Sequence, residues 1–269
     1  MKLDTETVQN ISLDILNYVA NICEKLNLRY YLMYGSLIGA VRHKGFIPWD
    51  DDVDIMMPRE DYNQLLCFLK ENIDKRYELF EPNTVSRYPY MIARISDKNY
   101  KIVMNNEEKY GMGIFIDIYP FDGVGNSLKE AKKIVRKGNV LSSMCYQATR
   151  KRYAVETTTS FIRQCVKFPV FIMSKIIGKE YFQNKLKKLE NIKNYEESKY
   201  ISCVVWASGG EKDIFKRSWF DSYIYMDFQK YRFRVPKDYD EVLKHTYGNY
   251  MKLPDEKDRI GHHYYEVEI

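Results

Sequence analysis

Apolar residues near the N-terminus recur every three or four positions, with polar residues between them. The positions that share this spacing are Val8, Ile11, Ile15, Val19, Ile22 and Leu26. Because an α-helix turns once every 3.6 residues, this spacing places the apolar side chains on one face. The pattern predicts an amphipathic helix from about Thr5 to Leu26 that packs against the body of the fold.

Shorter apolar runs, bounded by Gly, Pro, Asp, Asn and Ser, follow this helix and indicate β-strands. We expect strands at residues 30–34, 53–57, 90–95, 101–104 and 113–119. Pro58 suits the first turn of a helix, which we expect to continue to about Lys70. The predicted fold class is α/β (α+β), with a mixed sheet of about five strands and flanking helices.

The chain changes in character after about residue 126. Ser127 and Glu130 have the spacing of a capping box, which predicts a helix that ends near Gly138. Later elements are expected as helices at 159–177 and 179–194, a strand at 200–206, a hairpin at 223–235 and a helix at 239–246. We therefore predict a core at residues 1–126, a helical lobe at 127–195, and a segment at 196–269 that packs back on the core.

An acidic run from Asp50 to Asp54 opens the second expected strand. Side chains alternate between the two faces of a strand, so Asp52 and Asp54 are expected to share a face. Asp50 and Asp51 precede the strand and are expected to support the site or contact solvent. Asp117 lies in the middle of a later apolar run and would need a cation to stay charged when buried. An Asp-x-Asp pair alone also occurs on solvated turns.

Asp52, Asp54 and Asp117 would repel one another strongly if they met. Hard divalent cations take oxygen ligands, so one or two Mg²⁺ or Mn²⁺ ions would make the arrangement favourable. The five cysteines are scattered without a Cys-x-x-Cys pair and there are only four histidines. These counts exclude a zinc ribbon and a histidine-rich metal site, so the predicted metal chemistry rests on the three carboxylates.

The stretch YYLMYGSLIGAVRHKGFIPWDDDVDIMMPRED, from Tyr30 to Asp61, resembles the nucleotidyltransferase fold of the DNA polymerase beta type. In that fold a Gly-Ser turn cradles phosphate, and acids on two later strands bind metal. One departure is that the fifteen residues between Ser36 and Asp52 are more than is usual there. The narrower motif GAVRHKGFIPWDDDVD is similar to the LicD family, and fukutin-related enzymes are more distant relatives. RISDKNYKI, GIFIDIYPFD and YGNYMKLP extend this likeness along the chain.

The resemblance implies a metal-dependent transfer of phosphocholine from CDP-choline to a hydroxyl of a cell-surface glycan, such as teichoic acid or lipopolysaccharide, with release of CMP. It implies Asp52, Asp54 and Asp117 as catalytic and metal-binding residues. The substrate-binding candidates are Gly35, Ser36, Arg42, Lys44, Trp49, Arg259 and His262. Arg42 and Lys44 could instead be ordinary solvated charges of a loop. Arg259 and His262 could instead belong to a frayed C-terminal tail.

Other functions fit parts of the same pattern. The transferred group could be ribitol or glycerol phosphate from its CDP donor. An Asp-x-Asp motif also holds a metal against nucleotide sugars in glycosyltransferases, although the Gly-Ser step and the third acid favour phosphate transfer. A non-catalytic, membrane-apposed protein is the alternative outside enzymes, but all three acids are present.

Charge distribution bears on partners and location. Residues 127–195 contain sixteen Lys and Arg against four Glu, whereas the whole chain has a net charge of +5. This basic lobe is either a set of solvated helix faces or a surface that contacts anionic lipid near a lipid-linked acceptor. No nucleic-acid-binding motif accompanies the charge, so we predict no nucleic-acid partner. The N-terminus lacks the apolar region of a signal peptide, which predicts a cytoplasmic protein, peripheral to the membrane at most.

Overall fold

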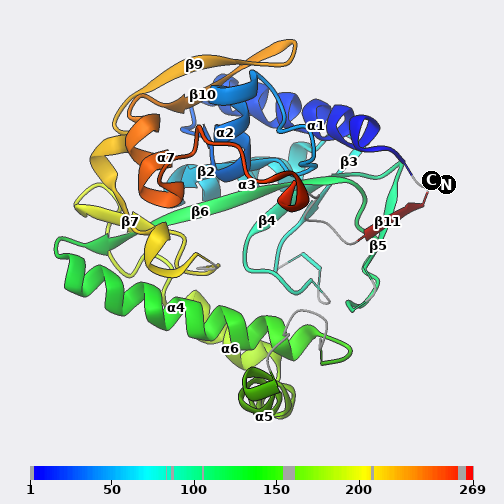
Figure 1. The fold of residues 1–269 in the computed structure, drawn as a ribbon, viewed down its shortest axis with the longest axis vertical. Helices are drawn as coiled ribbons and strands as arrows, with labels where there is room; N and C mark the ends of the chain where they lie inside the picture. The colour runs from blue at the N-terminus through cyan, green and yellow to red at the C-terminus, as the bar shows by residue number, and fades with distance from the viewer. Residues whose placement is uncertain are drawn as a thin grey trace.

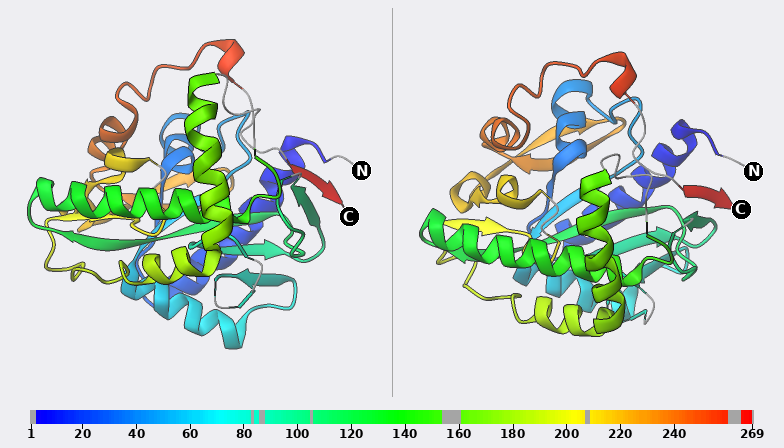
Figure 2. Two further views of the ribbon diagram at one scale, coloured as in Figure 1. Left: turned by 90° about the horizontal axis from the view of Figure 1, so that it is seen from below. Right: turned by 60° about the horizontal axis from the view of Figure 1, so that its bottom comes forward.

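The computed structural model describes residues 3–82, 84–85, 88–104, 106–153, 161–206, 209–259 and 265–268. A long mixed sheet crosses the molecule, and helices pack on both sides of it (Figures 1 and 2). The helix expected near the N-terminus is confirmed as α1 (Thr5–Lys25). Its buried side chains, which include Ile15, Leu16 and Val19, belong to the main hydrophobic core. The predicted α/β fold class is confirmed.

The central strands run in the order β1 (Tyr31–Leu32), β2 (Asp54–Pro58), β6 (Phe115–Gly125), β4 (Ala93–Asp97) and β3 (Tyr77–Phe80). Only β2 and β6 pair in parallel within this path. Five strands were expected, but one of them is different. β5 (Lys101–Met104) has the predicted bounds, yet it pairs with β11 (Tyr265–Glu268) instead of joining the central path. β3 takes its place and was missed.

The segment expected to be a loop after β1 is largely helix α2 (Tyr34–His43). Its buried residues include Leu37, Ile38 and Ala40. Gly39 has a packing role, because a Cβ atom there would lie 2.3 Å from the carbonyl oxygen of Gly45. The glycine lets the chain fold back tightly beyond the helix end at Lys44, which is left-handed. Helix α3 (Arg59–Asn72) then follows β2 as expected.

Helix α4 (Leu128–Thr149) begins at the predicted cap, where the Ser127 hydroxyl accepts a hydrogen bond from the Glu130 N–H. The expected stop at Gly138 is wrong, because the helix continues for eleven more residues. A Cβ atom at Gly138 would lie 2.2 Å from the carbonyl oxygen of Val204. This glycine therefore serves close packing between α4 and the segment after β7, and not helix termination.

Helices α5 (Phe161–Ile177) and α6 (Lys179–Lys187) complete the basic lobe. Figure 1 shows α4 alongside β6, with α6 and α5 beyond it. Strand β7 (Tyr200–Ser202) pairs with β6 on one side and with β8 (Phe215–Lys216) on the other. The remaining C-terminal elements are the short 3-10 helices η1 (Gly210–Asp213), η2 (Arg217–Phe220) and η3 (Glu256–Asp258), the confirmed hairpin β9 (Tyr223–Phe228) and β10 (Tyr231–Pro236), and α7 (Tyr239–Tyr247). In the described part of the chain no helix has the length and apolarity to cross a bilayer.

Candidate active site

The parallel pairing of β2 with β6 brings two acids from distant parts of the sequence together. Asp54 is in register with Asp117, and residues in register on adjacent strands project from the same face of a sheet. On the other side of β6, Arg94 of β4 is in register with Asp117. Three charged residues thus lie in a row across three neighbouring strands, in the order Asp54, Asp117, Arg94.

Arg94 forms a buried ion pair with Asp117. Its Nε atom donates to Oδ1 at 2.5 Å and its Nη2 atom to Oδ2 at 3.3 Å. The guanidinium carbon lies 3.9 Å from the ring centre of Tyr90 and 4.1 Å from that of Phe115. Sequence analysis treated Asp117 as a lone buried acid that needs a metal, but the protein itself supplies one cation.

Asp54 remains crowded by negative charge despite this pair. Burial raises the pKa of its carboxyl group well above the ordinary range, and the charges of Asp117 and Asp50 raise it further. Arg94 and a hydrogen bond from the Tyr119 hydroxyl oppose this effect but do not reverse it. The site therefore favours an additional positive charge next to Asp54.

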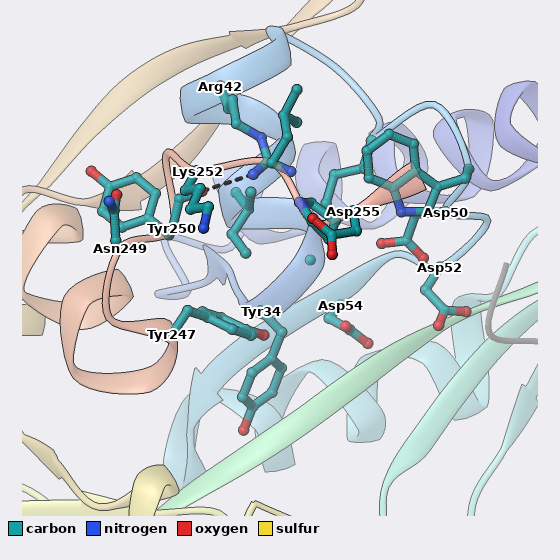
Figure 3. Close-up of a pocket in the computed structure, with 16 residues that line it drawn as sticks. Tyr34, Arg42, Asp50, Asp52, Asp54, Tyr247, Asn249, Tyr250, Lys252 and Asp255 are labelled. Carbon is teal, nitrogen blue, oxygen red and sulfur yellow. Dashed lines mark hydrogen bonds between the residues drawn. The ribbon is translucent and has the colours of Figure 1, made fainter. Parts of the chain in front are cut away.

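A cleft with a volume of about 640 Å³ opens over Asp54. Figure 3 shows Asp50, Asp52 and Asp54 at one end of this cleft, with Arg42 and Lys252 toward the other. The remaining lining residues are Tyr34, Gly35, Ile38, Ile47, Trp49, Tyr247, Asn249, Tyr250, Leu253, Pro254 and Asp255. The cleft thus combines an acidic end that suits a cation with basic side chains that suit a phosphate.

Gly35 and Ser36 lie in the first turn of α2 instead of in a turn at the end of a strand. Ser36 is buried, and its hydroxyl accepts a hydrogen bond of 2.9 Å from the N–H of Asp54. A Cβ atom at Gly35 would lie 2.6 Å from Oδ2 of Asp50. Ser36 therefore holds the start of β2, and the missing side chain of Gly35 makes room for the Asp50 carboxylate beside the positive end of the helix.

The other predicted binding residues separate into two groups. Arg42 and Trp49 line the cleft, and Arg42 Nη1 donates to the Tyr250 carbonyl oxygen at 2.7 Å. Arg259 places its guanidinium carbon 5.6 Å from the centre of the Trp49 ring. Lys44 is not among the lining residues; it caps α2, and its carbonyl oxygen accepts a hydrogen bond from the N–H of Gln229. His262 lies outside the described residues.

Sequence reasoning missed several residues of the cleft. Asp50 was expected only to support the site or to contact solvent, yet it lines the cleft. Tyr34 adopts a left-handed backbone conformation, with φ of 50°, at the start of α2. Its hydroxyl hydrogen-bonds to Asp213, whose burial raises its pKa to about 6. No motif connects positions this far apart in sequence.

The carboxylates fit a hard divalent cation in their chemistry, although they do not form a compact preformed cage. Among the described residues, no group of three or more His, Cys, Asp or Glu side chains is assembled closely enough to hold an ion. Asp54 and Asp117 are neighbours, whereas Asp52 approaches from the cleft side. The raised pKa of Asp54 is the observation that favours a cation there. The metal-binding role of the three acids stays a prediction.

Comparisons with known proteins agree with this arrangement. A family model described as the nucleotidyltransferase domain of LicD, FKTN and FKRP matches residues 27–139. The chain is 31% identical to the lipopolysaccharide cholinephosphotransferase LicD of Haemophilus influenzae, over 100% of this chain and 99% of that protein. It is also 50% identical over 44 residues to the ribitol 5-phosphate transferase FKRP of Homo sapiens, which covers 16% of this chain and 9% of that protein.

Proposed function

We propose, since the chain belongs to the LicD family of phosphotransferases, that it transfers phosphocholine from CDP-choline to a hydroxyl of a cell-surface glycan precursor, such as lipopolysaccharide or teichoic acid. The observation that carries this proposal is the cleft in which Asp54 is crowded by Asp50 and Asp117 opposite the basic side chains of Arg42 and Lys252. Such a cleft suits a diphosphate donor together with a divalent cation.

The residues of the chain have distinct roles in this reaction. Asp52, Asp54 and Asp117 would hold Mg²⁺ or Mn²⁺, which neutralises charge on the phosphate oxygens when bound. The acceptor oxygen forms a bond to the phosphorus that carries choline, the bond from that phosphorus to the oxygen of CMP breaks, and CMP leaves with the electron pair. The Asp54–Asp117 pair accepts the hydroxyl proton.

Donor binding uses the opposite part of the cleft. Arg42 and Lys252 contact the diphosphate, and the positive end of α2 at Tyr34 and Gly35 adds to the attraction. Trp49, which the Arg259 guanidinium approaches, lines one side of the cleft. Transfer of ribitol or glycerol phosphate is the second candidate, favoured by the likeness to the ribitol 5-phosphate transferase.

The test of this function is a donor panel. Purified protein with Mg²⁺ and an extract of glycan acceptors is incubated with CDP-choline, CDP-ribitol or CDP-glycerol, and CMP release is measured. We expect release from CDP-choline, a loss of at least about 100-fold in Asp52→Asn, and little change in Asp227→Asn, an exposed acid of the β9–β10 hairpin. CMP from CDP-ribitol or CDP-glycerol alone would redirect the donor, and release of a nucleoside diphosphate from a nucleotide sugar would contradict phosphate transfer.

We further propose that α5 holds the enzyme on the cytoplasmic face of an anionic membrane, near a lipid-linked acceptor. Large apolar side chains of α5 are exposed, with Ile176 at 81%, and the others are Phe168, Ile172, Met173 and Ile177. Lys167 and Lys175 lie on the same helix, which is the composition of an interfacial helix. Figure 2 shows α5 crossing α4 beyond the body of the fold.

Liposome co-sedimentation tests this surface. We expect binding to vesicles with anionic lipid, and a decrease of about tenfold or more when Ile176 and Met173 are both replaced by Asp, because apolar area and charge attraction both contribute. Val140→Asp on α4 is the matched control, since Val140 is 56% exposed but lies on another helix. Binding that is independent of anionic lipid, or equal in both variants, would contradict the proposal.

A further inference from the structure

We infer that a second pocket, beside α4, binds a sugar ring of the acceptor; this inference rests on the proposed function for its biological meaning. The pocket has a volume of about 400 Å³ and lies between α4, the segment before β4 and the segment after β7. Its lining residues are Tyr90, Asn139, Ser142, Ser143, Tyr146 and Trp206. None of these residues lines the cleft over Asp54.

Three aromatic rings surround this space in a fixed arrangement. Trp206 meets Tyr90 with ring centres 5.1 Å apart and Tyr146 with ring centres 6.0 Å apart, both edge to face. The Tyr90 hydroxyl donates to Glu107 Oε1 at 2.5 Å, and Arg150 Nη1 donates to the same atom at 2.7 Å. The rings therefore keep their positions without a ligand, and little conformational entropy is lost when one binds.

The lining combines chemistry that a sugar ring recognises. A sugar presents C–H groups on its faces and hydroxyls around its edge. Aromatic rings pack against the C–H faces. The Asn139 side-chain amide and the Ser143 hydroxyl can donate to and accept from the edge, whereas the Ser142 hydroxyl donates to the Asn139 carbonyl oxygen at 3.1 Å and can only accept from a ligand. A concave site with aromatic walls and a few polar groups is the usual form of a small-ligand site.

Two arginines behind the rings argue against a cationic ligand such as choline. The guanidinium carbon of Arg94 lies 3.9 Å from the ring centre of Tyr90, and that of Arg150 lies 3.8 Å from the ring centre of Tyr146. One face of each tyrosine ring is thus already occupied by a guanidinium group, and the lining residues include no acidic side chain that would attract a quaternary ammonium group.

A chain of side-chain contacts connects the pocket to the acids Asp117 and Asp54. Contacts lead from Tyr90 to Arg94, from Arg94 to Asp117, and from Asp117 to Asp54, which lines the donor cleft. The two acids therefore lie between the cleft and the pocket. Attack on phosphorus proceeds with the attacking and leaving oxygens roughly in line. An acceptor sugar in the pocket and a donor in the cleft would therefore flank the same pair of acids.

Steady-state kinetics with Trp206→Ala tests this assignment. We expect the acceptor KM to rise by about tenfold, because one aromatic contact is lost, while the KM for CDP-choline stays within a factor of two. Trp206→Phe restores most of the affinity, since it keeps an aromatic face. Trp219→Ala is the matched control, because Trp219 packs on His245 and does not line the pocket. An unchanged acceptor KM in Trp206→Ala, or an equal rise in the KM for CDP-choline, overturns the inference.

A binding measurement keeps this test separate from that of the proposed function. Saturation-transfer NMR with methyl glycosides of glucose, galactose and N-acetylgalactosamine, and with choline chloride, is expected to show contact for a glycoside with the wild-type protein and loss of that contact in Trp206→Ala. Ser143→Leu, at the exposed rim, gives the same loss if the tryptophan variant fails to fold. Choline contact in place of the glycosides, or no glycoside contact at all, overturns the inference. Glycoside binding without CMP release from any donor supports the pocket and contradicts the proposed function alone.

Discussion

Replacing Asp54 with Asn is expected to lower the transfer rate by about 10³-fold or more and, at neutral pH, to raise the melting temperature. The rate falls because the variant loses a charged oxygen ligand and a proton acceptor at the reacting phosphate. Stability rises because Asn relieves the repulsion that the folded chain otherwise places on Asp54 from Asp117 and Asp50.

The pH dependence of this stability gain follows from the direction of the pKa shift. The folded protein binds the Asp54 proton more tightly than the unfolded chain does, so wild-type stability falls as pH rises from about 4, the ordinary aspartate pKa, through the raised folded value. Asp54→Asn has no carboxyl group at this position, so its stability does not fall in this way as pH rises. Thermal unfolding followed from pH 4 to pH 8 should therefore show the two proteins diverging as pH increases.

Mg²⁺ provides the control for the same experiment. The ion should raise the melting temperature of the wild-type protein, because binding to the folded state alone stabilises it, and should have much less effect on Asp54→Asn. Asp227→Asn should behave like wild type in all three measurements, since Asp227 is exposed on the hairpin. A variant that keeps more than a tenth of the activity, or that melts below wild type at pH 7, would show that Asp54 is not the crowded acid of the site.

The sequence allowed the candidate acids of the site to be predicted because their signals are local. The apolar neighbours of Asp117 indicated a buried strand, and strand alternation predicted that Asp52 and Asp54 share a face. Asp52 lies before β2, although it lines the same cleft as Asp54. The prediction requires the strands that carry Asp54 and Asp117 to be neighbours. β2 and β6 pair in parallel, and their register places Asp54 next to Asp117. The metal itself stays a prediction, because no group of three or more His, Cys, Asp or Glu side chains among the described residues lies close enough to hold an ion.

Features that depend on tertiary packing could not be predicted in the same way. Gly35 and Gly39 lie in a helix where a turn and a loop were expected, and each allows a close approach, to Asp50 and to Gly45 respectively. The partner of Asp117 was hidden for a similar reason. Arg94 lies within an expected strand, but nothing local indicates that β4 joins β6 at that register. Propensity and spacing describe single elements, whereas these contacts depend on how elements pair.

Replacing Arg94 with Met should destabilise the protein by about 3–5 kcal/mol, because the change leaves Asp117 buried without its cation. Both side chains are buried, at 6% and 8% exposure, so water cannot replace the lost partner. The double variant Arg94→Met with Asp117→Leu should recover most of this loss, since neither charge then remains. Urea unfolding at pH 7 measures both differences. Arg217→Met is the matched control, because the ion pair of Arg217 with Asp221 is exposed and contributes about 1 kcal/mol or less.

The response of the Arg94 variant to Mg²⁺ distinguishes two roles for Asp117. If Asp117 can act as a metal ligand, a divalent cation takes over the position of the missing charge, and Mg²⁺ should stabilise Arg94→Met more than it stabilises the wild-type protein. If Asp117 serves only as the partner of Arg94, Mg²⁺ should stabilise both proteins equally. If removal of Arg94 lowered the free energy of unfolding by less than about 1 kcal/mol, Asp117 would not be a buried charge that depends on this ion pair. A buried carboxylate without its partner destabilises a protein by more than that.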